Sequence, residues 1–456
     1  AAQDSYFCIE QYLTEHYSMS PAPFAHGRLP RRSLLIAACL PALATSLLTA
    51  TGGQHATSER KREASERRND ILARLAKYSF HDFVRQFARG YEPGTEEWEQ
   101  REQIFLQRMK EVMDFHTGPE RSWDMGITKF MDFTEQEFNR VLGYRGRKKT
   151  MPRSSLLSVE KTDRKASKRA SKQADMPKYL NTLQTNSKLA LVIRDQGGCG
   201  SCWAEAAVAV LEARLENNKT LLSRLTSKSK SMGKKVQMPT LSTQTVVSCA
   251  PNPHHCGGTG GCGGATAELA YSLIKDQGVP LATTWPYRSA NGEAPTCRDH
   301  VFDQAAVGIT GWTVLPSNTV DPLKQALYTT NGPIVITAAA SGWAYYNAGI
   351  YSDITSDAPE GDFTVNHAVV LVGYKDPNPA KKELGYWIVK NSWGDSWGEN
   401  GYIRVEMKLA EQEHCGWDYS PKEGIACDGD PDKVWVCGTC GMLYDSTFPT
   451  GIYIRD

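Results

Sequence analysis

Residues 196–204 read Gln-Gly-Gly-Cys-Gly-Ser-Cys-Trp-Ala, and this stretch determines how the rest of the chain is interpreted. Val208, Leu211 and Leu215 follow Cys202 at helical spacing, so the sequence predicts a helix that begins at the cysteine. Unpaired amides at a helix N-terminus favour a negative charge, and a thiol with an ordinary pKa of about 8.5 needs such help to ionise near pH 7. Cys202 is therefore a candidate nucleophile.

Two later segments supply the groups that a nucleophilic thiol requires. Residues 366–369 read Asn-His-Ala-Val, and residues 386–394 read Tyr-Trp-Ile-Val-Lys-Asn-Ser-Trp-Gly. The imidazole of His367 can exchange a proton with the thiol and with a leaving amine, and Asn391 can hold the ring through its other nitrogen. Taken singly, a buried cysteine, a lone histidine and an Asn-Ser-Trp turn are more often structural than catalytic.

Taken together and in this order, the three segments resemble the active-site motifs of the papain-like (cathepsin) cysteine proteases. The resemblance implies an α+β fold of two lobes, one helical and one an antiparallel β-barrel-like lobe, with the active site between them. It implies that Cys202 is the nucleophile, His367 its base and Asn391 the residue that orients the ring. The side-chain amide of Gln196 and the Cys202 backbone N–H would form the oxyanion hole, worth on the order of 3 kcal/mol per donor. No cofactor and no metal are expected.

The same resemblance extends to the substrate cleft and to two disulfides. It implies the pairs Cys199–Cys262 and Cys249–Cys297. It also implies that an extended peptide binds along one stretch of backbone and beside the catalytic residues, at Gly263, Gly264, Ala265, Asn366 and Trp393. The chain departs from the family pattern at Ala265 and at Glu205, which stands where an aromatic residue is usual, so the side-chain preference of the cleft is left open.

Two polar segments explain why His367 and Asn391 follow Cys202 at a greater distance than the 130–150 residues or so that the family shows. Residues 217–237 and 251–260 are interpreted as insertions that leave the motifs intact. The first contains Asn218 in an Asn-Lys-Thr tripeptide, a candidate glycosylation site.

The last four cysteines, Cys415, Cys427, Cys437 and Cys440, leave the family pattern. Two interpretations fit: two disulfides among these four residues, or a tetrahedral zinc site, because Cys437 and Cys440 have ligand spacing. An oxidising compartment favours the disulfides. Cys256 is then the odd thiol, either free in its loop or exchanged into one of the pairs.

Residues 51–144 are predicted to form a helical inhibitory prodomain. Phe80, Phe83, Phe87 and Tyr91 recur at helical intervals, and a second helix is predicted after Pro93. The family's propeptide motifs are matched, with departures at Arg108, His116 and Thr128, by Glu97, Arg101, Ile104, Phe105, Gly126, Phe130 and Asp132. Without that resemblance, the segment would be interpreted as a small helical domain of no special role.

The remaining segments concern targeting and processing. Residues 145–172 hold eleven basic and two acidic residues, typical of a solvated linker and equally of a processing site, so 145–175 is taken as a basic processing linker. Residues 34–50 are uncharged and follow three arginines, so 19–50 is interpreted as a cleaved signal peptide, with a signal-anchor or a buried helix as alternatives. Residues 1–18 are a possible non-coding leader. The peptidase domain is expected at 176–456, with the helical lobe at about 176–300 and the β lobe at about 301–456.

The composition of the chain limits its expected binding partners and its cellular location. The formal net charge of +1 gives no reason to expect nucleic acid, and twelve cysteines, ten of them after residue 195, indicate the secretory pathway, hence a lysosome or vacuole or the extracellular space. The expected partners are polypeptide substrates and the chain's own prodomain, in a monomer. Two alternatives remain at this point: a catalytically silent binding protein and a metal-binding secreted protein.

Overall fold

The computed structural model describes residues 52–143, 176–183, 192–231, 233, 239–353 and 361–455. The predicted leader, signal segment and basic linker lie outside these residues. The chain forms two units: one contains the described residues up to Tyr91 together with His116–Gly118, and the other contains Glu92–Phe115 and Pro119–Asp456. Within the described ranges, no helix has the length and apolar character needed to cross a membrane.

The first unit contains α2 (Gly52–Leu75) and α3 (Phe80–Gln86). Ser79 and Asp82 form a reciprocal cap at the start of α3. The apolar periodicity predicts a helix through Tyr91, but α3 ends at Gln86, because the chain turns into a left-handed conformation at Ala88. The Phe80 and Tyr91 rings nevertheless stack with centroids 5.8 Å apart, so the spacing reports their packing and not a continuous helix.

The second unit begins with α4 (Glu96–Thr117), whose last two residues belong to the first unit, followed by β1 (Trp123–Met125) and α5 (Glu135–Val141). Thr134 and Glu137 form a reciprocal cap at the start of α5. Arg101 of α4 donates two hydrogen bonds to the Glu137 carboxylate, at 2.6 and 2.7 Å, and one to the Asp132 carbonyl at 2.9 Å. These bonds fix α5 against α4.

The helix-rich part of the second unit surrounds α6, which begins at Cys202 as the sequence predicts. Its helices are α6 (Cys202–Asn217), α7 (Lys219–Ser231), α8 (Thr243–Cys249) and α9 (Ala267–Gln277), and α10 (Val320–Thr330) follows later in the chain. Most residues of α6 are buried, including Val208 and Leu211. A helix buried on most sides has a fixed position, and this rigidity holds its first residue in place.

The sheet confirms the α+β fold. The main path runs β1-β7-β10-β9-β8-β6-β13-β5, and β2 pairs with β8. The strands are β2 (Tyr179–Asn181), β3 (Val279–Pro280), β4 (Ala305–Gly308), β5 (Gly311–Val314), β6 (Ile334–Ala338), β7 (Tyr346–Tyr351), β8 (His367–Lys375), β9 (Gly385–Lys390), β10 (Tyr402–Met407), β11 (Cys415–Asp418), β12 (Val434–Cys437), β13 (Ser446–Thr450) and β14 (Tyr453–Ile454). The pairings along the main path are antiparallel, as predicted for this lobe, except that β7 and β10 run parallel.

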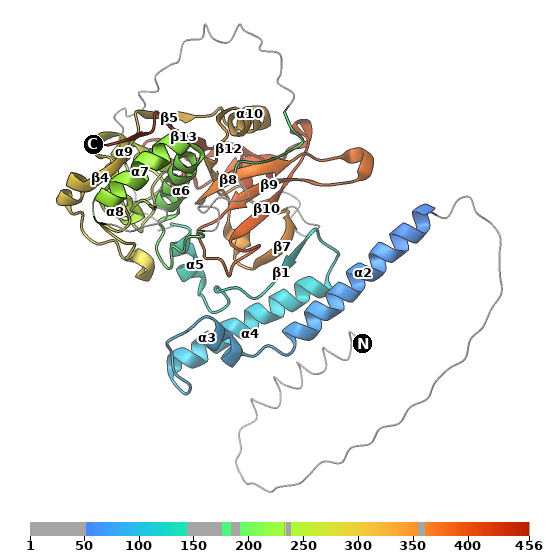
Figure 1. Cartoon of the computed structure of the whole chain (residues 1–456). Coiled ribbons are helices and arrows are strands. Elements are labelled where there is room, and N and C mark those ends of the chain that lie inside the picture. Colours follow the sequence, from blue (N-terminus) through green and yellow to red (C-terminus); the bar gives the residue numbers. More distant parts are fainter. Residues whose placement is uncertain are drawn as a thin grey trace, which may run out of the picture. The chain divides into compact units, whose positions relative to one another are not determined.

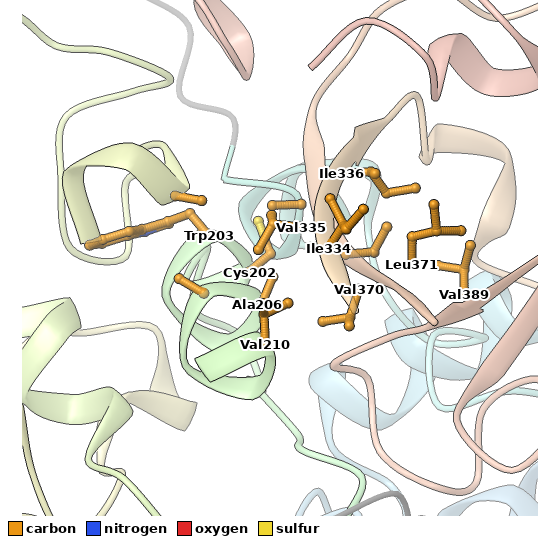
Figure 2. Close-up of a cluster of buried hydrophobic side chains, with 14 of the residues drawn as sticks. Cys202, Trp203, Ala206, Val210, Ile334, Val335, Ile336, Val370, Leu371 and Val389 are labelled. Atoms are coloured by element: carbon orange, nitrogen blue, oxygen red, sulfur yellow. The ribbon is translucent and has the colours of Figure 1, made fainter. Parts of the chain in front are cut away.

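The core joins the helices to the sheet. Figure 2 shows Ala206 and Val210 of α6 turned toward Val335 of β6 and Val370 of β8. Figure 1 shows α6 to α9 gathered on one side of this unit and β7 to β10 on the other. Since Cys202 begins α6 and His367 begins β8, this packing brings the two motif residues to one place.

Candidate active site

Cys202 occupies the first position of α6 and is 5% exposed. The preceding Ser201 gives no side-chain hydrogen bond to the helix amides. The positive end of the helix dipole therefore lies next to the sulfur, as the sequence predicts.

His367 and Asn391 meet because their strands pair. His367 begins β8 and Asn391 follows β9, and the two strands run antiparallel with Val370 opposite Lys390. Asn391 Oδ1 lies 2.9 Å from His367 Nε2. The Trp393 ring stacks on the imidazole with centroids 4.8 Å apart. Nδ1 has no hydrogen-bond partner among the described residues, so it is the nitrogen left for a thiol, and Cys202 lines the same cavity as His367.

The side-chain amide of Gln196, which the sequence predicts as an oxyanion donor, is already engaged in hydrogen bonds. Its Nε2 donates to the carbonyl of Val141 at 2.7 Å and to that of Cys199 at 2.8 Å. Its Oε1 accepts a hydrogen bond from Ser392 Oγ at 2.7 Å, which fixes the orientation of the amide. The carbonyl of Val141, from the predicted prodomain, thus occupies a donor of the amide that was predicted to bind a substrate carbonyl.

Residues 126–143, here called the covering segment, lie over this site. Gly143 lies against the backbone of Gly200 and Gly264, and a side chain on either of those two glycines would collide with Gly143. The rings of Phe130 and Phe138 both pack on Trp393, with centroids 5.1 and 5.6 Å away. Figure 1 places α5 beside the start of α6. The covering segment therefore excludes a peptide from the site.

Burial changes the pKa of both catalytic candidates, Cys202 and His367. Burial raises the pKa of Cys202 to about 11. Burial lowers the pKa of His367 to about 4, although the hydrogen bond to Asn391 opposes this shift. Because both shifts oppose charge separation, the covered site holds a neutral thiol and a neutral imidazole near pH 7.

The predicted substrate residues divide into two groups. Gly264, Ala265 and Asn366 line the cavity that Cys202 and His367 share, whereas Gly263 and Trp393 do not. The carbonyl of Gly263 accepts a hydrogen bond from Thr259 N at 3.0 Å within the helix-rich part. Trp393 is fully buried behind the imidazole.

The described residues contain four disulfides, and one expectation about them is wrong. The structure forms Cys199–Cys262 and Cys249–Cys297, as the resemblance implies, and Cys415–Cys437 among the last four cysteines. Cys427 pairs instead with Cys256, which was expected to be free or exchanged into one of the pairs. Cys440, expected in a disulfide, is a free buried thiol. With three of the four cysteines oxidised, the alternative of a zinc site built from all four does not hold.

Glu205 does not line the cavity that Cys202 and His367 share. Its carboxylate accepts hydrogen bonds from Thr243 Oγ1 at 3.1 Å and from Arg194 at 3.3 Å. Arg194 also donates to Glu212 at 2.7 Å. The charge that replaces an aromatic residue is thus neutralised inside the helix-rich part.

Asn218 lies exposed just before α7, and its side chain accepts a hydrogen bond from Leu221 N at 3.1 Å. Its glycosylation stays a prediction.

Sequence reasoning missed three groups of residues near the site. Ser392 lies inside the recognised Asn-Ser-Trp motif, so the motif could have pointed to its hydrogen bond with Gln196. Val141 was included in the prodomain, but no motif points to its carbonyl. Asp445, which lines the cavity, and Glu268, whose charge acts on Asp445, belong to no pattern.

Comparisons with known proteins agree with this geometry. The family model described as papain family cysteine protease matches residues 176–424, and the cathepsin propeptide inhibitor domain (I29) matches residues 80–138. Ananain of Ananas comosus is 29% identical over 81% of this chain and 87% of its own length. Germination-specific cysteine protease 1 of Arabidopsis thaliana is 30% identical over 71% of this chain and 75% of its own. The solved structure of digestive procathepsin L2 proteinase from Tenebrio molitor larval midgut, 22% identical, covers 81% of this chain and 98% of its own with a TM-score of 0.57. The chain therefore belongs to the papain family of cysteine proteases and carries a propeptide inhibitor domain of the cathepsin type.

Proposed function

We propose that this protein is a cysteine endopeptidase that attacks peptide bonds with Cys202 and is held inactive by its own residues 126–143. The observation that carries the proposal is the hydrogen bond from the Gln196 amide to the carbonyl of Val141, whose neighbour Leu142 lines the cavity of Cys202 and His367. An oxyanion donor that binds a carbonyl of the same chain is ready to bind the carbonyl of a substrate.

In the proposed reaction, the Cys202 sulfur forms a bond to the carbonyl carbon of the substrate. The Cys202 proton, held on His367 Nδ1, passes to the leaving amine as the C–N bond breaks. Water then attacks the acyl-enzyme and gives its proton to His367, and the thiol is regenerated as the acid product leaves. Asn391 keeps Nδ1 toward the sulfur by holding Nε2, and Trp393 keeps water from that hydrogen bond.

Removal of the covering segment reverses the electrostatic effect of burial. Water reaches the site, the desolvation that raises the pKa of Cys202 and lowers that of His367 falls, and the amides at the start of α6 again favour the thiolate. The propeptide would therefore inhibit in two ways, by blocking the peptide and by keeping the pair neutral.

We further propose that residues 51–144 are the removable prodomain, that residues 145–175 are where cleavage occurs, and that the mature enzyme starts near residue 176. Four disulfides support a secretory-pathway location, in a lysosome or vacuole or outside the cell.

A thiol-directed epoxide tests the proposal. After acid activation it should label Cys202 stoichiometrically, and the intact zymogen should be labelled far more slowly. Absence of labelling at Cys202 after the prodomain has been removed would contradict the proposed function. N-terminal sequencing of the activated enzyme should give a start between residues 145 and 184.

A further inference from the structure

The cavity beside Cys202 and His367 has a polar inner wall that the proposed chemistry does not use. The cavity is narrow in the covered protein and partly open to solvent. Away from the catalytic pair it is lined by Thr266, Ala267, Val335, Thr337, Asp445 and Thr447. An apolar substrate side chain would meet three hydroxyls and a carboxylate there, so the wall is suited to a polar group.

Two buried polar atoms, one at this wall and one on the residue that follows the lining residue Ala267, lack the partners that such atoms normally have. Thr337 is 8% exposed, and its Oγ1 has no hydrogen-bond partner among the described residues. Glu268 Oε1, out of contact with solvent, has no partner there either. Buried polar atoms are almost always hydrogen-bonded, so these two atoms indicate that a polar group of a ligand supplies the missing hydrogen bonds.

Asp445 lines the cavity, as does Glu423 near its opening, and a further buried carboxylate, Glu268, acts on Asp445. Burial raises the pKa of Glu268, and burial together with the charge of Glu268 raises the pKa of Asp445 well above its ordinary value. The groups that lower the pKa of Glu268 are its own backbone and the hydroxyls of Thr266 and Thr447. Among the described residues, no lysine, arginine or histidine acts on Asp445 or Glu268. A cation placed here would relieve the repulsion and allow both groups to ionise.

The mouth of the cavity lies where the substrate backbone is expected to bind. Ala265 lines one side, and Gly424 lines the other. The loops around Gly257 and Gly424 are joined by the Cys256–Cys427 disulfide and by a hydrogen bond from Gly257 N to Ala426 O at 3.0 Å. Leu142 of the covering segment also lines the cavity and brings no charge to it. Removal of the covering segment therefore leaves a preformed pocket with unsatisfied acids.

We propose that this pocket binds an arginine or lysine side chain of the peptide substrate, and that Asp445, supported by Glu268, determines this specificity. The inference rests on the proposed function of Cys202. Arginine should be preferred to lysine, because its planar group can donate to the carboxylates and to Thr337 together, whereas lysine acts as a point charge.

The chain's own sequence offers a substrate of this kind. The predicted processing linker, residues 145–172, carries eleven basic residues and follows the covering segment directly. A pocket selective for basic side chains would thus suit cleavage of the linker by another copy of the activated enzyme.

A positional-scanning library of fluorogenic peptides tests the proposal on the acid-activated enzyme. Each of the three positions before the cleaved bond is varied in turn, and active enzyme is counted by epoxide titration of Cys202. At one of these positions, arginine should exceed leucine in kcat/KM by a factor on the order of 10 to 100, the usual worth of a charged hydrogen bond. Asp445→Asn should reduce this ratio to about unity, and Glu268→Gln should reduce it partly.

The matched control is Asp353→Asn, which neutralises another buried carboxyl with a raised pKa that does not line this cavity. Its arginine-to-leucine ratio should equal that of the unmodified enzyme. A wild-type enzyme without a basic preference at any of the three positions overturns the inference, even if Asp445→Asn does not fold. An arginine preference unchanged in Asp445→Asn overturns it as well. In both cases, Cys202 labelling and peptide cleavage would leave the proposed function standing, whereas an unlabelled Cys202 would remove both.

Discussion

Cys202 and Cys440 are both buried and outside any disulfide in the described part of the chain, yet only one of them has surroundings that can make it reactive. Cys202 begins a sixteen-residue helix and shares a cavity with His367. Cys440 lies in a short turn with a positive φ of 57°, and its backbone N–H is 3.0 Å from Asp353 Oδ2. Burial, followed by the charge of Asp353, raises the pKa of Cys440 well above its ordinary value.

The difference teaches that burial alone makes a thiol inert. What distinguishes Cys202 is a helix N-terminus, an imidazole held by Asn391, and a cover that can be removed. Cys440 has acidic neighbours in place of a base. The residues that bury it belong to the folded peptidase domain and stay in place when the prodomain is removed. Each of the following predictions tests one of these distinctions, from the largest expected effect to the smallest.

Replacing each thiol in turn should give the largest contrast. Cys202→Ala should lower kcat/KM of the activated enzyme by a factor on the order of 10⁴ or more, because no other group supplies the nucleophile. Cys440→Ala should leave kcat/KM within about twofold. Circular dichroism and thermal unfolding would show that both variants fold. A Cys202→Ala enzyme with most of its peptidase activity would refute the catalytic assignment.

The pH dependence of labelling should separate the two thiols in the zymogen. With a pKa of about 11 under the cover, the thiolate of Cys202 should become about tenfold more abundant for each unit of pH between 6 and 9. Its alkylation by iodoacetamide should rise in step and then increase on the order of 10²-fold or more when the prodomain is removed. Cys440 should react only after denaturation, as peptide mass spectrometry would show. Equal labelling of both cysteines in the native zymogen would argue against the comparison.

Asn391→Ala should make the surroundings of Cys202 more like those of Cys440. The imidazole loses the acceptor at Nε2 and its fixed orientation, so kcat should fall on the order of 10²-fold, less than on loss of the sulfur itself. Asn391→Asp is the companion variant, because a carboxylate can still accept the hydrogen bond and should restore part of the rate. If both variants kept the wild-type rate, Asn391 would have no orienting role.

Loosening the cover should have the smallest effect. Arg101→Gln removes the two hydrogen bonds that tie α4 to Glu137 of α5, which should weaken the covering segment by about 1–2 kcal/mol and speed acid activation about tenfold. Lys110→Gln, which removes an exposed pair with Asp114 on the same helix, is the control and should activate at the wild-type rate.

The Arg101–Glu137 pair determines the pH range in which Arg101→Gln speeds activation. Burial raises the pKa of Glu137, but hydrogen bonds from Arg101 and Thr134 outweigh it and hold the pKa at about 2, below the ordinary 4.5. A depressed pKa means that the contribution of this pair is fully present above about pH 4.5 and is lost as the pH falls toward 2. The rates of Arg101→Gln and wild type should therefore differ above pH 4.5 and converge below it. An equal ratio at pH 6 and pH 3 would show that Glu137 is not the partner that matters.

The sequence predicts the arrangement of Cys202, His367 and Asn391 well because each of the elements that carry them is encoded locally. The helix α6 starts at Cys202, the strand β8 starts at His367, and the strand β9 ends just before Asn391. Each of these elements can be predicted from a few neighbouring residues. Once these elements are assigned to one known fold, the 2.9 Å contact between His367 and Asn391 follows from strand pairing.

What escaped prediction depends on contacts between distant segments. The Cys256–Cys427 bond spans 171 residues, and nothing in the spacing of the cysteines favours it over Cys427–Cys440. Asp445 and Glu268 come from different parts of the chain, and neither belongs to a motif. The helix predicted through Tyr91 failed for a related reason: aromatic residues at helical spacing pack together across the turn at Ala88 as well as along a helix.

The Cys256–Cys427 bond also affects how the mature enzyme would withstand damage. Cys256 lies among the helices and Cys427 among the strands, so a cut anywhere between them leaves both pieces covalently attached. A protease that works among other proteases is exposed to such nicks, and one that is nicked in this stretch should keep its two halves together until the disulfide is reduced. The closed ring also limits the unfolded chain, by an amount on the order of 3–5 kcal/mol, so the helical and sheet halves should unfold in one step.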